Sequence, residues 1–527
     1  MLRSVSLTPT VVHGGARLAE LKALQPSWHK VFAAASRDQA WMNEVFGPMA
    51  EKCAWTAQEM AVYNRVHARL LEKPTLLLPN AVYLKTGPDD FALGVCNVQA
   101  GEPYQVQLVH DYQAASVVKG QLEAGPLAAV TETLAKAARM VHPTQPVVAI
   151  LSKPTTTLAL RTKADVVGVA ARLKAVEGVP TVLYVSMVDL ATATLDKDNH
   201  LVFQGHKISV IYSRYDFSHP SGSFVKRAHD HSSGSSSSGI VEAADSSSPA
   251  DPAKWAGEWA AVERMEQSTC ILSSSIASRL ANRRGVLYAL ANSPGAIERF
   301  LSDSPHKSSS NARSADGSTP SSSSSSNDSS NSGQSSIAAE AAAFRALLPE
   351  QWALGDEVAS SSSSWSLRNQ ASEVKALQDM VEANPDAFVA KNVLRPRTGS
   401  DKTQNRLASG GALVEDPSGL RALFEINKST GELAGKHHVL YRKIGLEQHD
   451  ASIAHDGEVY SLERDNHGGA TSEVCTYGAY LADAQNNVLE SREIGVGVRT
   501  KPADLNHPLT KALGYGAVSC CLVVPNA

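Results

Sequence analysis

The sequence predicts an α/β fold of several lobes, and three features of the chain lead to this expectation. Its residues are 43% hydrophobic, which is ordinary for globular proteins and enough for a large core. Apolar residues recur at helical spacing near the N-terminus, and continuous apolar runs typical of buried strands follow them. A chain of 527 residues is expected to form two or three lobes rather than one.

Charge, cysteine usage and hydropathy exclude several classes of protein. With 49 basic and 53 acidic side chains the formal net charge is −4, which gives no electrostatic case for binding nucleic acid or a membrane surface. The six cysteines form no C-x-x-C pair, so neither a zinc site nor a disulfide framework is expected. No run approaches the ~20 apolar residues of a membrane helix. The N-terminus resembles a transit peptide only weakly, so a cytoplasmic protein is favoured.

The first seventy residues predict an antiparallel helical layer, because their apolar side chains recur at three- and four-residue spacing. These positions are Trp28, Val31, Phe32, Met42, Val45, Phe46, Met49, Val62, Val66 and Leu70. Pro74 ends the layer. Short strands are then expected at residues 76–78, 80–84 and 104–109.

A βαβ unit with an added hairpin is predicted after Pro146. The expected elements are a strand at 147–151, a helix at 163–176, and strands at 181–185, 201–203 and 208–212. The strand at 147–151 is a continuous apolar run, and the helix stops before Gly178. Such a unit carries a ligand at the ends of its strands.

The rest of the chain predicts helices and a second α/β lobe. Helices are expected at 259–267 and 275–290, and alternating strands and helices at 388–391, 419–427, 439–444, 472–481 and 517–524. Three serine-rich segments, 232–250, 303–336 and 359–364, are expected to be disordered insertions, because they hold too few apolar residues to offset the loss of chain entropy.

Five segments resemble, in the same order, motifs of the eukaryotic-type glutathione synthetases, which are ATP-grasp ligases. Residues 208–217 (ISVIYSRYDF) are similar to V-V-Y-[FY]-R-x-G-Y, 275–284 (SIASRLANRR) to P-x-I-A-x-x-L-A-G-x-K, 388–391 (FVAK) to F-V-L-K, 472–480 (SEVCTYGAY) to S-E-L-G-x-x-G-x-Y, and 498–501 (VRTK) to L-R-T-K. The resemblance covers residues 20 to 525 and implies an ATP-grasp-type fold.

This resemblance implies three domains and a reaction. Residues 1–145 would hold the helical layer and the first strands of the ATP-grasp core, 146–215 a small substrate-binding lobe, and 216–527 the C-terminal core and lid. The implied reaction joins γ-glutamylcysteine to glycine with ATP and Mg²⁺, through an acyl phosphate, giving glutathione, ADP and phosphate. The implied assembly is a homodimer.

The resemblance also implies the residues of the site. The nucleotide would be bound by Arg284, Lys391, Asn405, Tyr441, Lys443, Glu473 and Lys501. The peptide substrate would be bound by Arg214, Phe217, Arg499 and Ser116, with Arg499 and Lys391 acting in catalysis and Asp111 as a metal ligand. Cations suit a triphosphate, and a guanidinium suits a carboxylate. A surface ion pair is the alternative for either arginine, and a solvated strand-end lysine for Lys391.

Several departures from the family pattern leave other functions open. Val109 stands where the family has a metal-binding glutamate, and Arg395 where it has another. The ATP loop that follows Lys391 is long and retains only Gly399 of the glycines. The sequence is therefore also compatible with a non-catalytic binding protein of this fold, or with a ligase for a different acid and amine.

Overall fold

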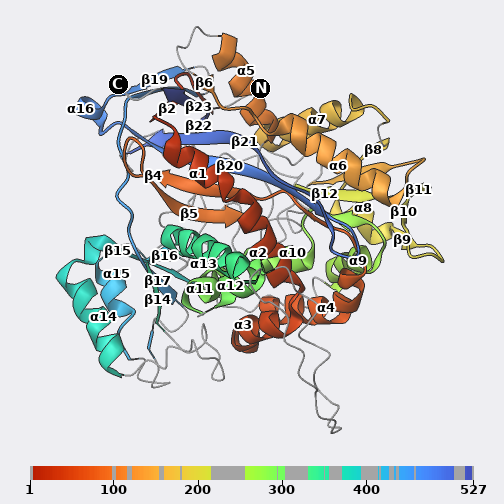
Figure 1. The fold of residues 1–527 in the computed structure, drawn as a ribbon, viewed down its shortest axis with the longest axis horizontal. Coiled ribbons are helices and arrows are strands. Elements are labelled where there is room, and N and C mark those ends of the chain that lie inside the picture. The colour runs from red at the N-terminus through yellow and green to blue at the C-terminus, as the bar shows by residue number, and fades with distance from the viewer. Residues whose placement is uncertain are drawn as a thin grey trace, which may run out of the picture.

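The computed structural model describes residues 4–97, 103–115, 121–152, 160–178, 181–214, 256–293, 295–302, 330–348, 350–354, 371–392, 413–414, 417–426, 433–434, 438–455, 458–503 and 517–524. Over these ranges the chain is a mixed α/β protein with several sheets (Figure 1). The predicted α/β class is thus confirmed. No helix of the described ranges is long and apolar enough to cross a membrane.

A nine-stranded sheet forms the centre of the molecule, in the order β19-β18-β1-β22-β21-β20-β4-β5, with β3 also paired to β20. Its strands are β1 (Ser4–Ser6), β3 (Thr75–Leu77), β4 (Asn80–Lys85), β5 (Phe91–Asn97), β18 (Ala451–His455), β19 (Glu458–Leu462), β20 (Ala470–Ala482), β21 (Val488–Pro502) and β22 (Ala517–Ser519). The antiparallel hairpin β20–β21 is its longest pairing. The strands expected at 76–78 and 80–84 are confirmed as β3 and β4.

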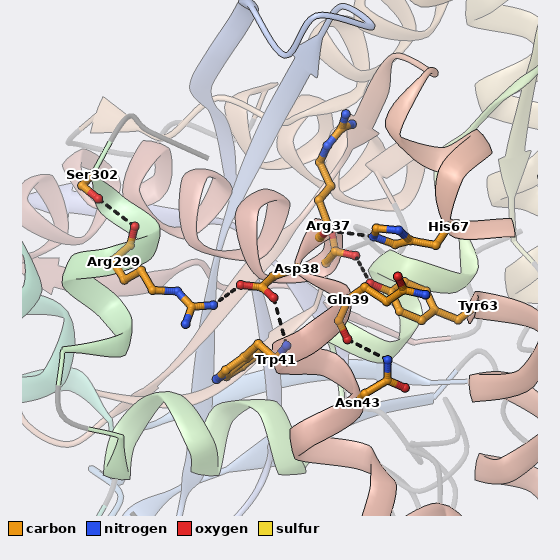
Figure 2. A network of polar contacts seen from close by, with 10 residues as sticks. Arg37, Asp38, Gln39, Trp41, Asn43, Tyr63, His67, Arg299 and Ser302 are labelled. Atoms are coloured by element: carbon orange, nitrogen blue, oxygen red, sulfur yellow. Dashed lines mark hydrogen bonds and ion pairs between the residues drawn. The ribbon is translucent and has the colours of Figure 1, made fainter. Parts of the chain in front are cut away.

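The N-terminal helical layer is confirmed over residues 16–71, whereas Ser4–Ser6 and Thr10–His13 form strands and not helix. It consists of α1 (Ala16–Ala23), α2 (Gln25–Arg37), α3 (Gln39–Lys52) and α4 (Ala54–Leu71), and α2 packs on β20 and β21. At the junction of α2 and α3, Asp38 caps α3 by accepting a hydrogen bond from the backbone of Trp41 and pairs with Arg299, as Figure 2 shows. Three short helices complete this layer: α10 (Ile276–Ala281), α11 (Arg284–Asn292) and α12 (Ala296–Leu301), with α13 (Ser330–Leu347) beside α12.

The predicted βαβ unit forms a four-stranded parallel sheet in the order β13-β12-β7-β8. Its elements are β7 (Val147–Leu151), α7 (Leu160–Lys174), β8 (Thr181–Val185), β12 (Val210–Ser213) and β13 (Ile271–Leu272). Helices α5 (Pro103–Ala115) and α6 (Leu127–Val141) pack against α7. The expected hairpin is present as β9 (Thr194–Leu195), β10 (Leu201–Phe203) and β11 (His206–Lys207), beside α8 (Met187–Thr192) and α9 (Ala256–Gln267).

Two smaller sheets complete the fold. An antiparallel sheet in the order β14-β17-β15-β16, with α14 and α15, forms a separate unit at one side of the molecule in Figure 1 and has its own apolar core. Its elements are β14 (Gln351–Ala353), α14 (Ala371–Ala383), β15 (Phe388–Asn392), β16 (Leu413–Val414), α15 (Pro417–Ala422) and β17 (His438–Arg442). The other sheet pairs β2 (Thr10–His13) and β6 (Gln121–Leu122) with β23 (Cys521–Val524).

Three predictions about elements require correction. Residues 104–109 lie in helix α5, not in a strand, because their buried positions Val106, Val109 and Gln113 follow helical spacing. The helix expected over 275–290 is two helices, separated at Asn282 and Arg283. Helix α13 begins at Ser330, inside the segment 303–336 that was expected to be disordered, because the alanine-rich sequence that follows favours helix.

Candidate functional site

Three of the predicted site residues lie together on the central hairpin. Glu473 of β20 is opposite Arg499 of β21, and Lys501 is opposite Thr471. Opposed residues and residues two apart along a strand share one face of a sheet, so Glu473, Arg499 and Lys501 face the same side. The Lys501 Nζ lies 3.4 Å from Glu473 Oε1, and about a quarter of each side chain is exposed (27% and 23%). Arg499 is buried, at 7% exposure.

Helix α5 packs on this face of the sheet. Gly497, two residues before Arg499, has no side chain, and a Cβ there would lie 2.8 Å from a methyl group of Val106 on α5. The glycine therefore lets α5 approach β21 closely. Gly497 lies just before the motif at residues 498–501, and the motif does not account for it. The close approach of α5 does.

The first turn of α5 is joined to Arg214, another predicted substrate residue. Arg214 directly follows β12, at the carboxyl end of a strand in the parallel sheet, where α/β proteins bind ligands. Its guanidinium lies 3.1 Å from the buried carboxylate of Asp165 on α7. Asp165 also accepts a hydrogen bond of 3.0 Å from the backbone N–H of Tyr104. Helix α5 thus contacts β21, the strand that carries Arg499, and also Asp165, the carboxylate that pairs with Arg214.

The opposite face of the hairpin carries a buried polar cluster that the sequence did not predict. Ser472 Oγ lies 3.0 Å from the hydroxyls of Thr10 and Thr500, and 2.7 Å from His449 Nε2. His449 Nδ1 donates to the carbonyl of Asp450, so the neutral ring accepts from Ser472 at Nε2. Burial lowers the pKa of His449 and so favours this neutral form.

The segment between β17 and β18 ties the sheet of Lys391 to the central sheet. The backbone N–H of Glu447 donates to the carbonyl of Lys85 at 2.9 Å, and the side chains of these two residues form an ion pair. Lys85 ends β4 beside Leu84, which is opposite Glu473. The segment that follows β17 is therefore attached to the end of β4, close to Glu473. Burial lowers the pKa of Lys85.

The predicted nucleotide residues of the smaller sheet lie on adjacent strands. Lys391 is opposite Val439, and Tyr441 is opposite Val389. The side chain of Lys391 is outside the part of the structure that is described, so the structure does not test its direction. Lys443 is exposed, and its backbone N–H donates to the carbonyl of Ala387 at 2.7 Å.

The remaining predicted residues are not brought to this site by the described structure. Arg284 is the first residue of α11, and its side chain is not described. Ser116, Phe217, Asn405 and the ATP loop at 393–405 lie outside the described residues.

Asp111, the predicted metal ligand, lies on α5 with 63% of its side chain exposed. Its carboxylate accepts a hydrogen bond of 2.8 Å from Gln107 and lies 3.4 Å from His110 Nδ1. Within the described ranges, three side chains that are close enough together to hold a metal lie in the β9–β10 hairpin, away from Asp111. They are Asp196, Asp198 and His200. Among the described residues, Asp111 therefore has His110 beside it but belongs to no group of three such side chains, and its role as a metal ligand stays a prediction.

Comparisons with known proteins bear on the fold. No protein-family model and no curated protein matches the sequence. The structure is similar to that of a glutathione synthetase-like effector from Globodera pallida in its apo form, with a TM-score of 0.59 and 12% identity over 99% of this chain and 91% of the other. A candidate gamma-glutamylcysteine synthetase from Methylobacillus flagellatus gives a TM-score of 0.36 at 10% identity, over 96% of this chain and 86% of the other. The first match shows a similar fold.

Proposed function

We propose that the protein is an ATP-dependent carboxylate–amine ligase related to the glutathione synthetases, with an ATP-grasp-type fold. The observation that carries the proposal is the shared face of Glu473, Arg499 and Lys501. These residues were assigned to ligand binding from two separate motifs, and adjacent strands bring them together. The similarity in fold to a glutathione synthetase-like protein supports the same family of activities.

The side chains on this face fit a nucleotide that carries a triphosphate. Lys501 is part-exposed and so can exchange its contact with Glu473 for a phosphate oxygen. Arg499 is buried and fixed in the sheet, which suits a guanidinium that holds one carboxylate or phosphate in a defined geometry. When bound, ATP would activate the acid substrate by phosphoryl transfer. The chain's part is to orient the two substrates and stabilise negative charge during that transfer.

An ATP-dependent ligase needs oxygen ligands for Mg²⁺, and carboxylates are the usual ones. Asp111 and Glu473 are the carboxylates that the sequence and the structure offer near α5 and β20. Residues 393–405, which follow Lys391 in the sequence, contain a further carboxylate, Asp401.

A second function is favoured by the contact between Arg214 and Asp165. If Arg214 binds a substrate carboxylate, Asp165 competes for the same guanidinium, because both are negatively charged and Asp165 is fully buried. This arrangement favours a protein that binds nucleotide without turnover, because the carboxylate of any acid substrate would meet the same competition.

The discriminating experiment measures ADP release by the full chain with ATP, Mg²⁺ and pairs of acid and amine substrates. γ-Glutamylcysteine with glycine is the first pair, and other dipeptides and amino acids follow. ADP release that requires both an acid and an amine supports the ligase. Nucleotide binding without ADP release for any pair supports the binding protein, and neither binding nor turnover refutes both.

A further inference from the structure

A small cavity lies where the end of α2 meets β3, α10 and the segment after α4. Its volume is about 30 Å³, and the residues around it include Arg37, Lys73, Thr75 and Glu266. A buried water molecule needs roughly 10–15 Å³ of such space, so the cavity can hold one or two. The residues that line it are distinct from those of the proposed nucleotide site.

Lys73 supplies a buried positive charge on one side of the cavity, with 5% of its surface exposed. Its Nζ donates to the backbone carbonyl of Glu266 at 3.1 Å and lies 3.5 Å from the carbonyl of Met265. An ammonium group has three N–H donors, so at least one is left for another acceptor. Burial lowers the pKa of Lys73.

Glu266 supplies a buried negative charge that also lines the cavity, with 1% of its surface exposed. One carboxylate oxygen, Oε1, accepts a hydrogen bond from the backbone N–H of Ile276 at the start of α10. The other, Oε2, is buried and has no hydrogen-bond partner among the described residues. Leaving a buried charged acceptor unsatisfied is costly, so this oxygen requires an occupant of the cavity as its partner.

Arg37 closes the cavity from the helical layer. Figure 2 shows its side chain extending away from the contacts of Asp38, and its guanidinium donates to Thr75 Oγ1 at 2.9 Å and to the carbonyl of Leu71 at 2.8 Å. Two cationic side chains and one carboxylate therefore surround the space. A metal cation would be repelled by Arg37 and Lys73, and an anion by Glu266.

We propose that this cavity is a binding site for one or two water molecules that bridge the Lys73 ammonium group to Glu266 Oε2. The two side chains line the same space without forming a direct ion pair in the described structure. Water accepts from the lysine and donates to the carboxylate, which neither a cation nor an anion can do. The bridge connects the end of α4 to the end of α9, and so fastens the helical layer to the segment that leads into β13.

Two measurements on the full chain test the proposal. A high-resolution crystal structure should show one or two waters within hydrogen-bond distance of both Lys73 Nζ and Glu266 Oε2. Oxygen-17 magnetic relaxation dispersion should count one or two fewer long-lived internal waters in the double variant Lys73→Met/Glu266→Leu than in the parent protein. An empty cavity, a bound anion, or a direct contact between the two side chains would overturn the proposal, as would an unchanged water count.

Matched variants keep the test decisive. Lys174 and Glu177 are exposed on and after α7, so the double variant Lys174→Met/Glu177→Gln should leave the water count unchanged. Glu266→Gln keeps one acceptor oxygen, which the backbone N–H of Ile276 occupies, and places an N–H donor where Oε2 was. The bridging water then loses its acceptor on residue 266, so the water count should fall in this variant too. This variant provides the test should the apolar double variant fail to fold, because an unchanged water count in Glu266→Gln would contradict the bridge.

Discussion

The Lys501 ammonium group lies 3.4 Å from a carboxylate oxygen of Glu473, across the longest strand pair of the central sheet. Each of these residues belongs to a different sequence motif, and the ladder of β20 and β21 fixes their separation. A cation held beside a carboxylate on a part-exposed sheet face is a contact that a phosphate group can replace. The proposed nucleotide site therefore depends on the register of this hairpin.

The first prediction concerns Lys501. Replacing it with methionine removes a charged donor while keeping the length of the side chain. A charge-assisted hydrogen bond contributes roughly 1.5–3 kcal/mol, so affinity for ATP should fall by about 10- to 100-fold, measured by calorimetry. Lys136→Met on α6, where the lysine is exposed, should leave affinity unchanged. Equal affinity in the Lys501 variant and the parent would remove Lys501 from the nucleotide site.

The second prediction concerns Asp165. The variant Asp165→Asn retains an oxygen that can accept from the backbone of Tyr104 but removes the charge beside Arg214. If Arg214 binds the acid substrate, the affinity for γ-glutamylcysteine should rise by roughly 10-fold or more, because the competing carboxylate is gone. Asp198→Asn, at an exposed position, is the control. Unchanged or weaker binding in Asp165→Asn would show that Asp165 does not compete with the substrate.

The third prediction concerns a buried ion pair. Arg283 and Glu59 are 7% and 2% exposed and form a salt bridge between α4 and the residue before α11. Removing one partner from such a pair leaves an uncompensated buried charge, so Arg283→Met should lower the free energy of unfolding by roughly 3–5 kcal/mol.

The control for this pair is Arg65→Met, which breaks the exposed ion pair between Arg65 and Glu263. Its cost should be about 1 kcal/mol or less, measured in the same denaturant titration. The double variant Arg283→Met/Glu59→Leu should recover stability relative to Arg283→Met alone. If Arg283→Met lowered the free energy of unfolding by no more than Arg65→Met does, the buried ion pair would be no more important for stability than the exposed one.

The fourth prediction concerns pH. Burial raises the pKa of the Glu258 carboxyl on α9 from 4.5 to about 8. Between these two values the folded state binds the proton and the unfolded state has lost it, so the stability that this group contributes falls as the pH rises. It is fully present below pH 4.5 and is lost by about pH 8.

Glu258→Gln removes the titration. The difference in unfolding free energy between the parent protein and this variant should therefore decline from pH 5 to pH 8 and stay constant above it. The total decline should be smaller than for a fully buried carboxyl, because Glu258 is only part-buried. Glu177→Gln at an exposed position should show no such trend. A flat difference for Glu258→Gln would show that its pKa is not raised.

The sequence was sufficient for elements whose pattern is local. The helical layer and the parallel unit follow from apolar spacing within single segments, and both are present. The sequence predicts a strand at 104–109 because Tyr104, Val106 and Leu108 alternate with polar residues. In a segment this short, the two-residue repeat of a strand and the three- to four-residue repeat of a helix fit the same apolar positions. Strand β21 contains a polar run at residues 490–493, and its length follows from pairing with β20, which no local pattern reveals.

The candidate site was predictable only in part, for the same reason. Motifs gave Glu473, Arg499 and Lys501, because each lies in a short recognisable segment. Thr10 and His449 join Ser472 from other parts of the chain, and Asp165 meets Arg214 only because the tertiary structure brings α7 to the residue that follows β12. Contacts between residues so far apart in sequence are set by tertiary structure, which spacing alone does not encode.

The most direct test of the ligase proposal is ADP release from ATP and Mg²⁺ in the presence of γ-glutamylcysteine and glycine. The account predicts ADP release that depends on both an acid and an amine and that is abolished in Lys391→Ala. ADP release that persists unchanged in Lys391→Ala, or no nucleotide turnover with any acid and amine pair, would contradict it.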